Sequence, residues 1–339
     1  MLRALQIENF RGLRKVDLPE LRRVNLIVGA NDTGKTSVLE ALTLLLGDRQ
    51  MVASLASAFR SGSSGSSAKE DRIHFWDWLF FDRDLRNSVK LQAELDEGIT
   101  VRLSQDQERD PHSGGALPAF HVNVTPGHTS KTVRLDEDGV SVWETPPDTT
   151  PLKVARHELG AGSTLEEAER FNEIALRNGG EDRLQRLMQE IDPRVQRLRY
   201  AKLRGSQNPL VYVDIGLSSL VPITQMGQAF RRLFRIYVDV LAARAQVLLI
   251  DEIENGIFSE SMPKIWTGLM ELCAREGVQI FATTHSRECV MAAQAATQTR
   301  GQDDLALFRL QRVKGEIEAI RLGGQHLELA AEMCLEVRS

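Results

Sequence analysis

GANDTGKTS, at residues 29–37, fits the pattern GxxxxGK[ST] and decides the fold. An apolar run at 24–28 predicts a buried strand before it. Apolar residues at helical spacing through 38–46 predict a helix after it, which ends near Gly47. Between a strand and a helix, the glycines of this pattern let the backbone wrap closely around a phosphate, with N–H groups and the helix N-terminus facing the anion. A glycine turn that only caps the helix is the alternative interpretation.

The residues of this loop have separate expected roles. We expect Lys35 to neutralise the β- and γ-phosphates of a nucleotide and to assist catalysis, and the Thr36 hydroxyl to bind Mg²⁺. The remaining contacts with the phosphates are expected from five neighbours in the same loop: Asn31, Asp32, Thr33, Gly34 and Ser37.

Length and composition restrict the class of protein. The chain has 339 residues, 42% hydrophobic and 26% charged, which is typical of a globular protein and excludes a mainly disordered or fibrous one. The net charge of −5 excludes a surface that is basic throughout. The apolar runs are too short to cross a bilayer, the charged N-terminus is unlike a signal peptide, and the three cysteines have no metal-ligand spacing. We therefore expect a cytoplasmic protein without a membrane partner.

The middle of the chain predicts an added antiparallel layer. Hydrophobicity alternates with a period of two within 89–145, and the turns at 96–98 and 136–139 predict two β-hairpins there. The stretch SGSSGSS at 61–67 cannot bury a core, so we expect a mobile surface loop.

The second half of the chain predicts helices followed by an alternation of strands and helices. Thr164 and Glu167 have the spacing of a capping box, and an amphipathic helix follows near 230–241. Alternating strands and helices in the last third predict a mostly parallel sheet and a final helix. We therefore expect an α/β fold in one domain over 1–339, with four parts: the loop lobe at 1–50, antiparallel hairpins at 89–145, a helical region at 160–243, and the alternating lobe at 244–339.

Two adjacent acids follow the apolar run at 247–250. A buried strand that ends in Asp251 and Glu252 is costly unless the carboxylates have a cation or a proton to handle. We expect Asp251 to hold Mg²⁺, directly or through water, and Glu252 to polarise the attacking water, because phosphoryl transfer depends on positioning more than on covalent chemistry. Acids at a strand end that merely cap a helix are the alternative.

His285 follows another apolar strand, at 279–284. Ligands of open α/β sheets lie beyond the carboxyl ends of the strands, so we expect His285 at the same edge as Asp251 and the loop. An imidazole there can contact the γ-phosphate and report its presence. A structural histidine is the alternative.

Together these motifs resemble the ABC/SMC-type ATPases, and among them the RecF-like and OLD-like (overcoming-lysogenisation-defect) ATPases of bacteria. LQIENFRGLRKVDL and NLIVGANDTGKTSVLEAL resemble their opening, VLLIDEIENGIF their Walker B and D-loop segment, and IFATTHSREC their switch-histidine segment. The closing strands LALFRL and EIEAIRL, followed by HLELAAEMCLEVRS, resemble their end. The resemblance spans nearly the whole chain, and it implies a P-loop ATPase that binds ATP and Mg²⁺, without the TOPRIM nuclease of OLD relatives.

The resemblance also implies a homodimer that closes on ATP head to tail, with a signature loop from each subunit on the other's γ-phosphate. The candidate loop is 224–232, with Gly227 and Gln228 as phosphate contacts, but Ala229 stands where relatives often have glycine. A plain helix start is the alternative. Phe258 stands where relatives commonly have histidine, so a role of this position across subunits is in doubt. Arg11 resembles the early arginine that approaches the nucleotide, and a surface arginine is its alternative.

One basic concentration is consistent with DNA contact. It comprises Arg194, Arg197, Arg199, Lys202, Arg204, Arg231, Arg232 and Arg235. Such residues can face a nucleic-acid backbone, but they are more often solvated or paired with acids.

These observations lead to two hypotheses about function. The first is a slow ATPase that acts as a nucleotide-driven dimerisation switch and controls a separate effector, a nuclease or a toxin, in phage defence or DNA maintenance. The second is a nucleotide-dependent scaffold or DNA-binding protein with little ATP turnover. An intrinsic nuclease is rejected because no further acids cluster at suitable spacing, and a transporter ATPase is disfavoured because the opening is RecF-like.

Overall fold

The computed structural model describes most of the chain, namely residues 1–47, 51, 78–84, 86–109, 116–125, 130–136, 139–145, 152–157, 164–243, 245–301 and 303–322. The predicted surface loop at 61–67 and the predicted final helix lie outside the described residues. No helix within the described ranges has the length and apolar character needed to cross a membrane.

A six-stranded sheet forms the centre, in the order β16-β15-β3-β14-β13-β9. Its strands are β3 (Val24–Gly29), β9 (Val154–His157), β13 (Val247–Ile250), β14 (Gln279–Thr284), β15 (Leu305–Val313) and β16 (Glu316–Leu322). All neighbours pair in parallel except β15 and β16, which form an antiparallel hairpin at the edge. The predicted mostly parallel sheet is therefore confirmed.

A second, antiparallel sheet has seven strands, in the order β2-β1-β4-β5-β6-β7-β8. They are β1 (Leu2–Phe10), β2 (Leu13–Leu18), β4 (Lys90–Leu95), β5 (Thr100–Arg109), β6 (Ala116–Thr125), β7 (Ser130–Asp136) and β8 (Gly139–Thr145). Both predicted hairpins are present, as β4–β5 and β7–β8. Strand β6, which joins the two hairpins, and strand β9 have no counterpart among the predicted elements.

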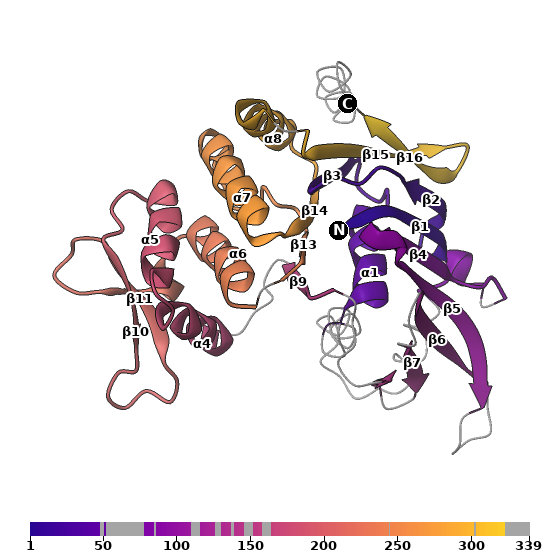
Figure 1. Ribbon diagram of the computed structural model, residues 1–339, viewed down its shortest axis with the longest axis horizontal. Coiled ribbons are helices and arrows are strands. Elements are labelled where there is room, and N and C mark those ends of the chain that lie inside the picture. Colours follow the sequence, from indigo (N-terminus) through magenta and orange to yellow (C-terminus); the bar gives the residue numbers. More distant parts are fainter. Residues whose placement is uncertain are drawn as a thin grey trace.

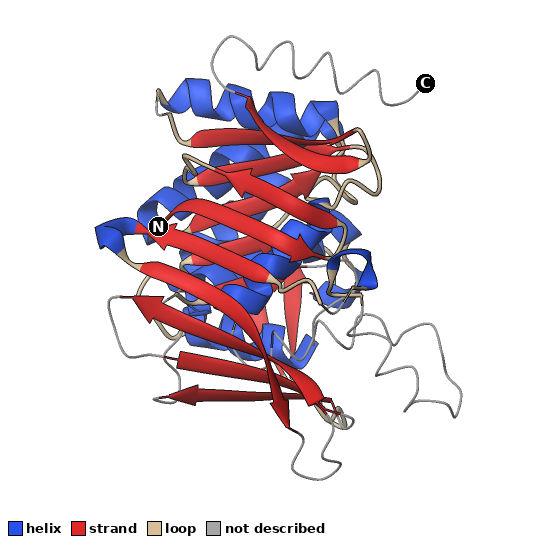
Figure 2. Ribbon diagram, turned by 90° about the vertical axis from the view of Figure 1, so that its right-hand side faces the viewer, coloured by secondary structure: helices blue, strands red, loops and turns tan. Residues whose placement is uncertain are grey.

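Helix α1 (Lys35–Leu46) lies between the two sheets, as Figures 1 and 2 show. Its buried side chains include Val38, Leu39 and Leu42, and they pack in one cluster with residues from both sheets. Leu249 and Phe281 are among the residues of the parallel sheet in this cluster. The helix that follows the phosphate loop is therefore held from both sides by apolar burial.

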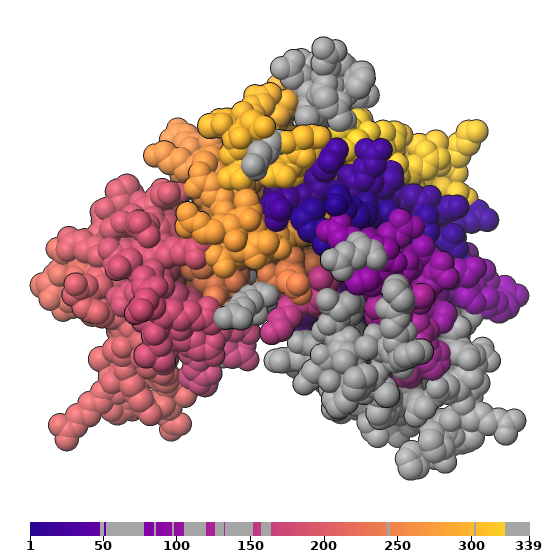
Figure 3. All heavy atoms as spheres, viewed as in Figure 1, coloured from indigo at the N-terminus to yellow at the C-terminus, as the bar shows by residue number. Residues whose placement is uncertain are grey.

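Five helices form a lobe on the side of the opposite face of the parallel sheet, where the first two pack on the outer side of the others (Figure 1). They are α4 (Thr164–Ala175), α5 (Gly180–Ile191), α6 (Gln228–Ala243), α7 (Met262–Glu276) and α8 (Arg287–Arg300). A small antiparallel sheet, β10 (Arg197–Ala201), β11 (Leu210–Asp214) and β12 (Val221–Pro222), packs on this helical lobe. The space-filling view shows the β10–β11 hairpin protruding from it (Figure 3).

Candidate nucleotide-binding site

The loop between β3 and α1 adopts a backbone that requires its glycines. Gly29 has φ 155° and Gly34 has φ 81°, both values that favour glycine. A Cβ on Gly29 would lie 2.4 Å from the carbonyl oxygen of Leu310, and one on Gly34 would lie 2.6 Å from Cδ2 of Leu13. The close approach of β15 and β2 to the loop therefore excludes larger residues at these two positions.

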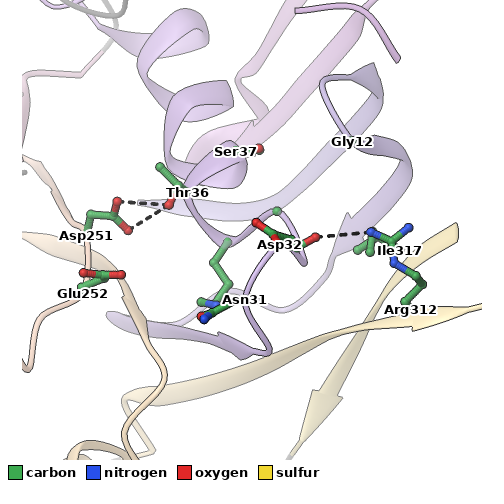
Figure 4. Close-up of a pocket in the computed structure, with 11 residues that line it drawn as sticks. Gly12, Asn31, Asp32, Thr36, Ser37, Asp251, Glu252, Arg312 and Ile317 are labelled. Atoms are coloured by element: carbon green, nitrogen blue, oxygen red, sulfur yellow. Dashed lines mark hydrogen bonds between the residues drawn. The ribbon is translucent and has the colours of Figure 1, made fainter. Parts of the chain in front are cut away.

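The loop lines an open pocket of about 640 Å³ (Figure 4). Figure 4 shows Asp251 and Glu252 at one end and Arg312, Ile317 and Gly12 at the other, with the loop between them. Besides these five, the lining residues are Asn31, Asp32, Gly34, Lys35, Thr36 and Ser37. Eight residues predicted from sequence thus line one cavity: Asn31, Asp32, Gly34, Lys35, Thr36, Ser37, Asp251 and Glu252.

Thr33 differs from its neighbours in the loop. It is buried and does not line the pocket, and its hydroxyl donates to the carbonyl oxygen of Ala30 at 2.8 Å. The Thr33 hydroxyl is therefore not directed at a phosphate, and the expected contact of this residue stays a prediction for its backbone. Thr33 instead braces the loop from within.

Lys35 places its ammonium group inside the loop. Its Nζ donates to the carbonyl oxygens of Gly29 at 2.9 Å and Ala30 at 2.7 Å. Burial lowers the pKa of Lys35, and the nearby carboxylates, Glu252 first and Asp251 second, partly oppose that effect. The loop thus holds a cation whose charge is only partly compensated by the protein, and an anionic ligand can complete the compensation.

Thr36 and Asp251 supply oxygen atoms suited to a hard cation. The Thr36 hydroxyl lies 3.1 Å and 3.3 Å from the two carboxylate oxygens of Asp251. Among the described residues no group of three or more His, Cys, Asp or Glu is arranged to hold a metal. Mg²⁺ is commonly held by one or two carboxylates together with substrate phosphates and water, so a hydroxyl and a carboxylate beside a phosphate loop fit this ion.

Glu252 lines the pocket in a constrained conformation. It has φ 46°, which is unusual for a residue with a side chain. Its N–H donates to the Thr283 hydroxyl at 2.8 Å, and that hydroxyl donates to Asp251 at 2.5 Å. The Asn255 side-chain amide donates to the carboxylate of Glu252. Thr283, on the neighbouring strand, therefore fixes the carboxylate of Asp251 and the backbone of Glu252.

His285 lies at the predicted edge of the sheet but not in the pocket lining. The parallel strands β3, β14 and β13 all end at this edge, which confirms the expected placement. The His285 side chain is 43% exposed, and its Nδ1 lies 2.9 Å from Oε1 of Glu254. The same oxygen accepts from the His285 backbone N–H at 2.8 Å. Glu254, which the sequence analysis overlooked, thus orients the histidine.

Arg11 does not approach the pocket as expected. Its guanidinium forms an ion pair with Glu40 of α1 at 2.5 Å, with both side chains largely buried. Burial lowers the pKa of Arg11, which the charge of Glu40 partly opposes. Arg11 thus fastens the β1–β2 turn to the helix that follows the loop, and its contact with a nucleotide stays a prediction.

Gly227 and Gln228 lie at the start of α6, outside the pocket lining. Gln228 packs beside Gly256, where a Cβ would lie 3.4 Å from that of Gln228. One turn later, Arg232 donates to the carbonyl oxygen of Asp251 and, at 3.2 Å, to that of Asn255. The candidate signature segment is thus tied to the turn that carries the acids of its own subunit.

Seven of the eight basic residues predicted for DNA contact divide into two sets, and the eighth, Arg231, is half-buried on α6. One set is engaged within the protein, as Arg194 with Asp192, Arg199 with Glu181, Arg235 with Glu167, and Arg232 with backbone carbonyls. The other set is exposed on the β10–β11 hairpin and its loop and comprises Arg197, Lys202 and Arg204. The candidate surface for nucleic acid is therefore smaller than the sequence predicts.

Comparisons with known proteins agree with this arrangement. A family model described as "AAA ATPase domain" matches residues 1–120, and one described as "AAA domain, putative AbiEii toxin, Type IV TA system" matches residues 141–290. An "ATP/GTP phosphatase" of Helicobacter pylori is 20% identical over 331 residues, which is 86% of each chain. An OLD nuclease of Thermus scotoductus is 52% identical over 48 residues, which is 14% of this chain and 9% of the relative.

Two further matches connect the chain to the RecF and SMC proteins. The DNA replication and repair protein RecF of Nitrosococcus oceani is 46% identical over 59 residues, 17% of this chain and 16% of that protein. The SMC head domain of Thermotoga maritima superposes with a TM-score of 0.52 at 10% identity, over 95% of this chain and 99% of that domain. The structural likeness shows the fold, and the two family models span the phosphate loop and the acid pair, respectively. The fold is therefore of the ABC/SMC ATPase type, and the sequence is similar to proteins of the RecF and OLD type.

Proposed function

We propose that this protein hydrolyses ATP to ADP and phosphate and uses the nucleotide as a switch for homodimerisation. The observation that carries the proposal is the single pocket in which Lys35 and Thr36 face Asp251 and Glu252. The loop with its hydroxyl and the acid pair come from two parts of the chain that lie far apart in the sequence. A purely structural loop does not need the two acids beside it.

Each side chain has a role that follows from its contacts. Lys35 is the cation for the terminal phosphates, and Thr36 and Asp251 would hold Mg²⁺, which neutralises charge on the phosphate oxygens when bound. Glu252, fixed by Asn255 and by the Thr283 hydroxyl, is placed to polarise the attacking water and accept its proton. His285 is the candidate sensor of the γ-phosphate. The name of the Helicobacter pylori relative, "ATP/GTP phosphatase", supports turnover of a nucleotide.

A second copy is needed to complete the site. Gly227 and Gln228 lie at the N-terminus of a long helix, where backbone N–H groups favour an anion, but outside the pocket of their own subunit. A head-to-tail pair would bring this segment to the phosphate in the other subunit. Hydrolysis would then reopen the pair, because the γ-phosphate is the contact shared by both copies.

The effector is proposed to be a separate protein, a nuclease or a toxin, in phage defence or DNA maintenance. This part of the proposal rests on the names of the relatives: a putative AbiEii toxin family, an OLD nuclease and RecF. A solved SMC head bound to the C-winged helix domain of ScpA, with a TM-score of 0.55 at 14% identity, is an example of the fold engaging a partner protein.

Glu252→Gln tests the switch. It keeps the side-chain shape and removes the proton acceptor, so we expect this variant to bind ATP, to lose hydrolysis and to accumulate as a dimer with ATP and Mg²⁺ in size-exclusion chromatography. Glu173→Gln, an exposed acid on α4, is the matched control and should behave as wild type. A Glu252→Gln protein that binds ATP but stays monomeric at every concentration would refute the dimer.

Lys35→Ala tests the phosphate loop itself. It removes the cation that faces the pocket, so the affinity for ATP should fall by at least tenfold, about 1.4 kcal/mol. Isothermal titration calorimetry measures this affinity directly. Unchanged binding would refute the assignment of the loop.

The alternative function is a nucleotide-dependent scaffold or DNA-binding protein with little turnover. Residues 194–214, which comprise the β10–β11 hairpin and the three residues before it, hold five basic residues and one acidic residue, Asp214. Contacts with a phosphate backbone weaken steeply with salt, so the affinity for DNA should fall between low and moderate salt concentrations. This decrease in affinity should be larger for the wild type than for the double variant Lys202→Ala/Arg204→Ala. Salt-independent binding would exclude a backbone contact.

A further inference from the structure

The end of the pocket opposite the acids is built from two β-hairpins. The β1–β2 turn contributes Gly12, and the β15–β16 hairpin contributes Arg312 and Ile317 (Figure 4). Arg312 and Ile317 are directly opposite each other in the ladder, so their side chains lie next to each other on one face. None of the motifs in the sequence accounts for this wall.

The wall is paired within its own hairpin and packs against β2. The β15–β16 turn has Lys314 at φ 51° and Gly315 at φ 91°, as in the tight two-residue turns that match the twist of a hairpin. Arg14 of β2 forms an ion pair with Glu316 of β16, which joins the two hairpins. The wall and the phosphate loop are thus parts of one preorganised site.

Arg312 is held at the open end of this site. Its guanidinium donates to the carbonyl oxygen of Gly315 at 3.0 Å and approaches that of Asp32, in the phosphate loop, at 3.4 Å. Among the described residues that line the pocket, Lys35 and Arg312 are the two cations. Arg11, which the family resemblance would bring to the nucleotide, is engaged with Glu40 instead.

The surroundings of Arg312 suit a flat ring. Gly12 has no side chain, and a Cβ built on it meets no atom within 4 Å, so the space above this turn is open. Ile317 is 3% exposed and supports Arg312 from within the wall, and a guanidinium held in a plane stacks on aromatic faces. A triphosphate with its terminal end beside Asp251 and Glu252 directs its nucleoside end toward this wall.

We propose that Arg312, supported by Ile317 and Gly12, forms the nucleobase subsite, which recognises a purine by stacking on its face. This inference rests on the proposed ATP site. Because every base has a π-face, such a subsite distinguishes nucleoside triphosphates from inorganic polyphosphate but distinguishes ATP from GTP only weakly.

The test compares ligands with and without a base. Arg312→Ala should weaken binding of Mg–ATP and Mg–GTP by about five- to tenfold in calorimetry, and leave binding of inorganic tripolyphosphate unchanged. Arg312→Lys should show a similar loss, because it keeps the charge but not the plane. Arg321→Ala removes a cation from the same hairpin, where Arg321 pairs with Glu20 outside the pocket, and should bind all three ligands as wild type does.

The outcomes separate this subsite from the ATP site itself. Lys35→Ala should lower the affinity for ATP and for tripolyphosphate together. If both affinities stay unchanged, the assignment of the phosphate loop is refuted. An equal loss of ATP and tripolyphosphate in Arg312→Ala would show a phosphate contact and overturn the base subsite. Full ATP affinity in Arg312→Ala or Arg312→Lys, or a loss confined to one purine, would overturn it as well.

Discussion

At the scale of single residues, the site combines side chains that a motif defines with side chains that only the fold brings together. Lys35, Thr36, Asp251 and Glu252 were predictable because spacing and the preceding buried strand fix their place at the sheet edge. Thr283 could be recognised from the sequence only weakly, as a polar residue in a buried strand. Its bonds to both acids depend on the pairing of β13 with β14, which the sequence alone does not specify.

Glu254 carries a prediction at this scale. Its carboxylate is 10% exposed and binds both the ring and the backbone N–H of His285. Glu254→Ala removes this orientation, so we expect kcat to fall by about tenfold, on the order of 1.4 kcal/mol in the activation barrier, with little change in ATP affinity. A steady-state ATPase assay combined with calorimetry measures the two quantities separately.

A double-mutant cycle shows whether Glu254 acts through the histidine. If it does, Glu254→Ala should add little to the loss caused by His285→Ala. Additive losses would mean that the two residues act independently. Glu173→Ala on the exposed face of α4 serves as the control and should leave kcat unchanged.

At the scale of elements, the helical lobe is stabilised by contacts between helices, and local sequence patterns predict other roles for the residues involved. The sequence places Glu167 in a capping box with Thr164, and α4 does begin at Thr164. Yet the carboxylate of Glu167 bonds to Nε of Arg235 on α6 at 2.7 Å, and the two side chains are only 7% and 17% exposed. The sequence likewise predicts Arg235 on a surface for DNA. Both predictions fail because the sequence pattern does not reveal which helices pack together.

The α4–α6 ion pair predicts a large effect on stability. Glu167→Ala leaves a buried guanidinium without its carboxylate, so we expect the free energy of unfolding to drop by about 3 kcal/mol. The matched control is Glu166→Ala, because Glu166 and its partner Arg170 are 50% and 40% exposed and 3.7 Å apart. Such a pair contributes about 0.5 kcal/mol or less. Urea denaturation of the two variants compares them directly, and equal losses would contradict the distinction.

At the scale of the whole molecule, the two kinds of sheet could be predicted from the sequence, but the pairing of strands that lie far apart in the chain could not. Alternating strands and helices predicted the parallel sheet, and alternating hydrophobicity predicted the hairpins. The sequence does not reveal that β1 pairs with β4, or that β9 adds to the edge beside β13, because both pairings join segments far apart in the chain. The wall with Arg312 depends on the same kind of long-range contact, between β2 and the β15–β16 hairpin.

The surface beside the acids has one feature that a monomer does not explain. Phe258 is 84% exposed, and the turn that carries it is held by backbone bonds from Ile257 to Glu254 and from Ser261 to Phe258, each 3.0 Å long. Gly256 of this turn packs against the start of α6, so Phe258 lies near the segment proposed to meet a second copy. A rigidly presented aromatic side chain is typical of the residues that dominate the energy of an interface.

If the ATP-bound pair closes over this surface, Phe258 should be buried in it. We expect Phe258→Asp, introduced into Glu252→Gln, to abolish the dimer seen with ATP and Mg²⁺ in size-exclusion chromatography while the affinity for ATP is retained, because a carboxylate would have to lose its water. Leu176→Asp is the control. Leu176 is 79% exposed, but its neighbour Arg177 binds the carbonyl of Leu241 near the far end of α6, roughly 20 Å along that helix from Gln228. A dimer that forms with Phe258→Asp as well as with Leu176→Asp would place the contact between copies elsewhere. Loss of the dimer in Phe258→Asp alone would show that Phe258, at the position where relatives commonly have histidine, supports dimerisation by becoming buried.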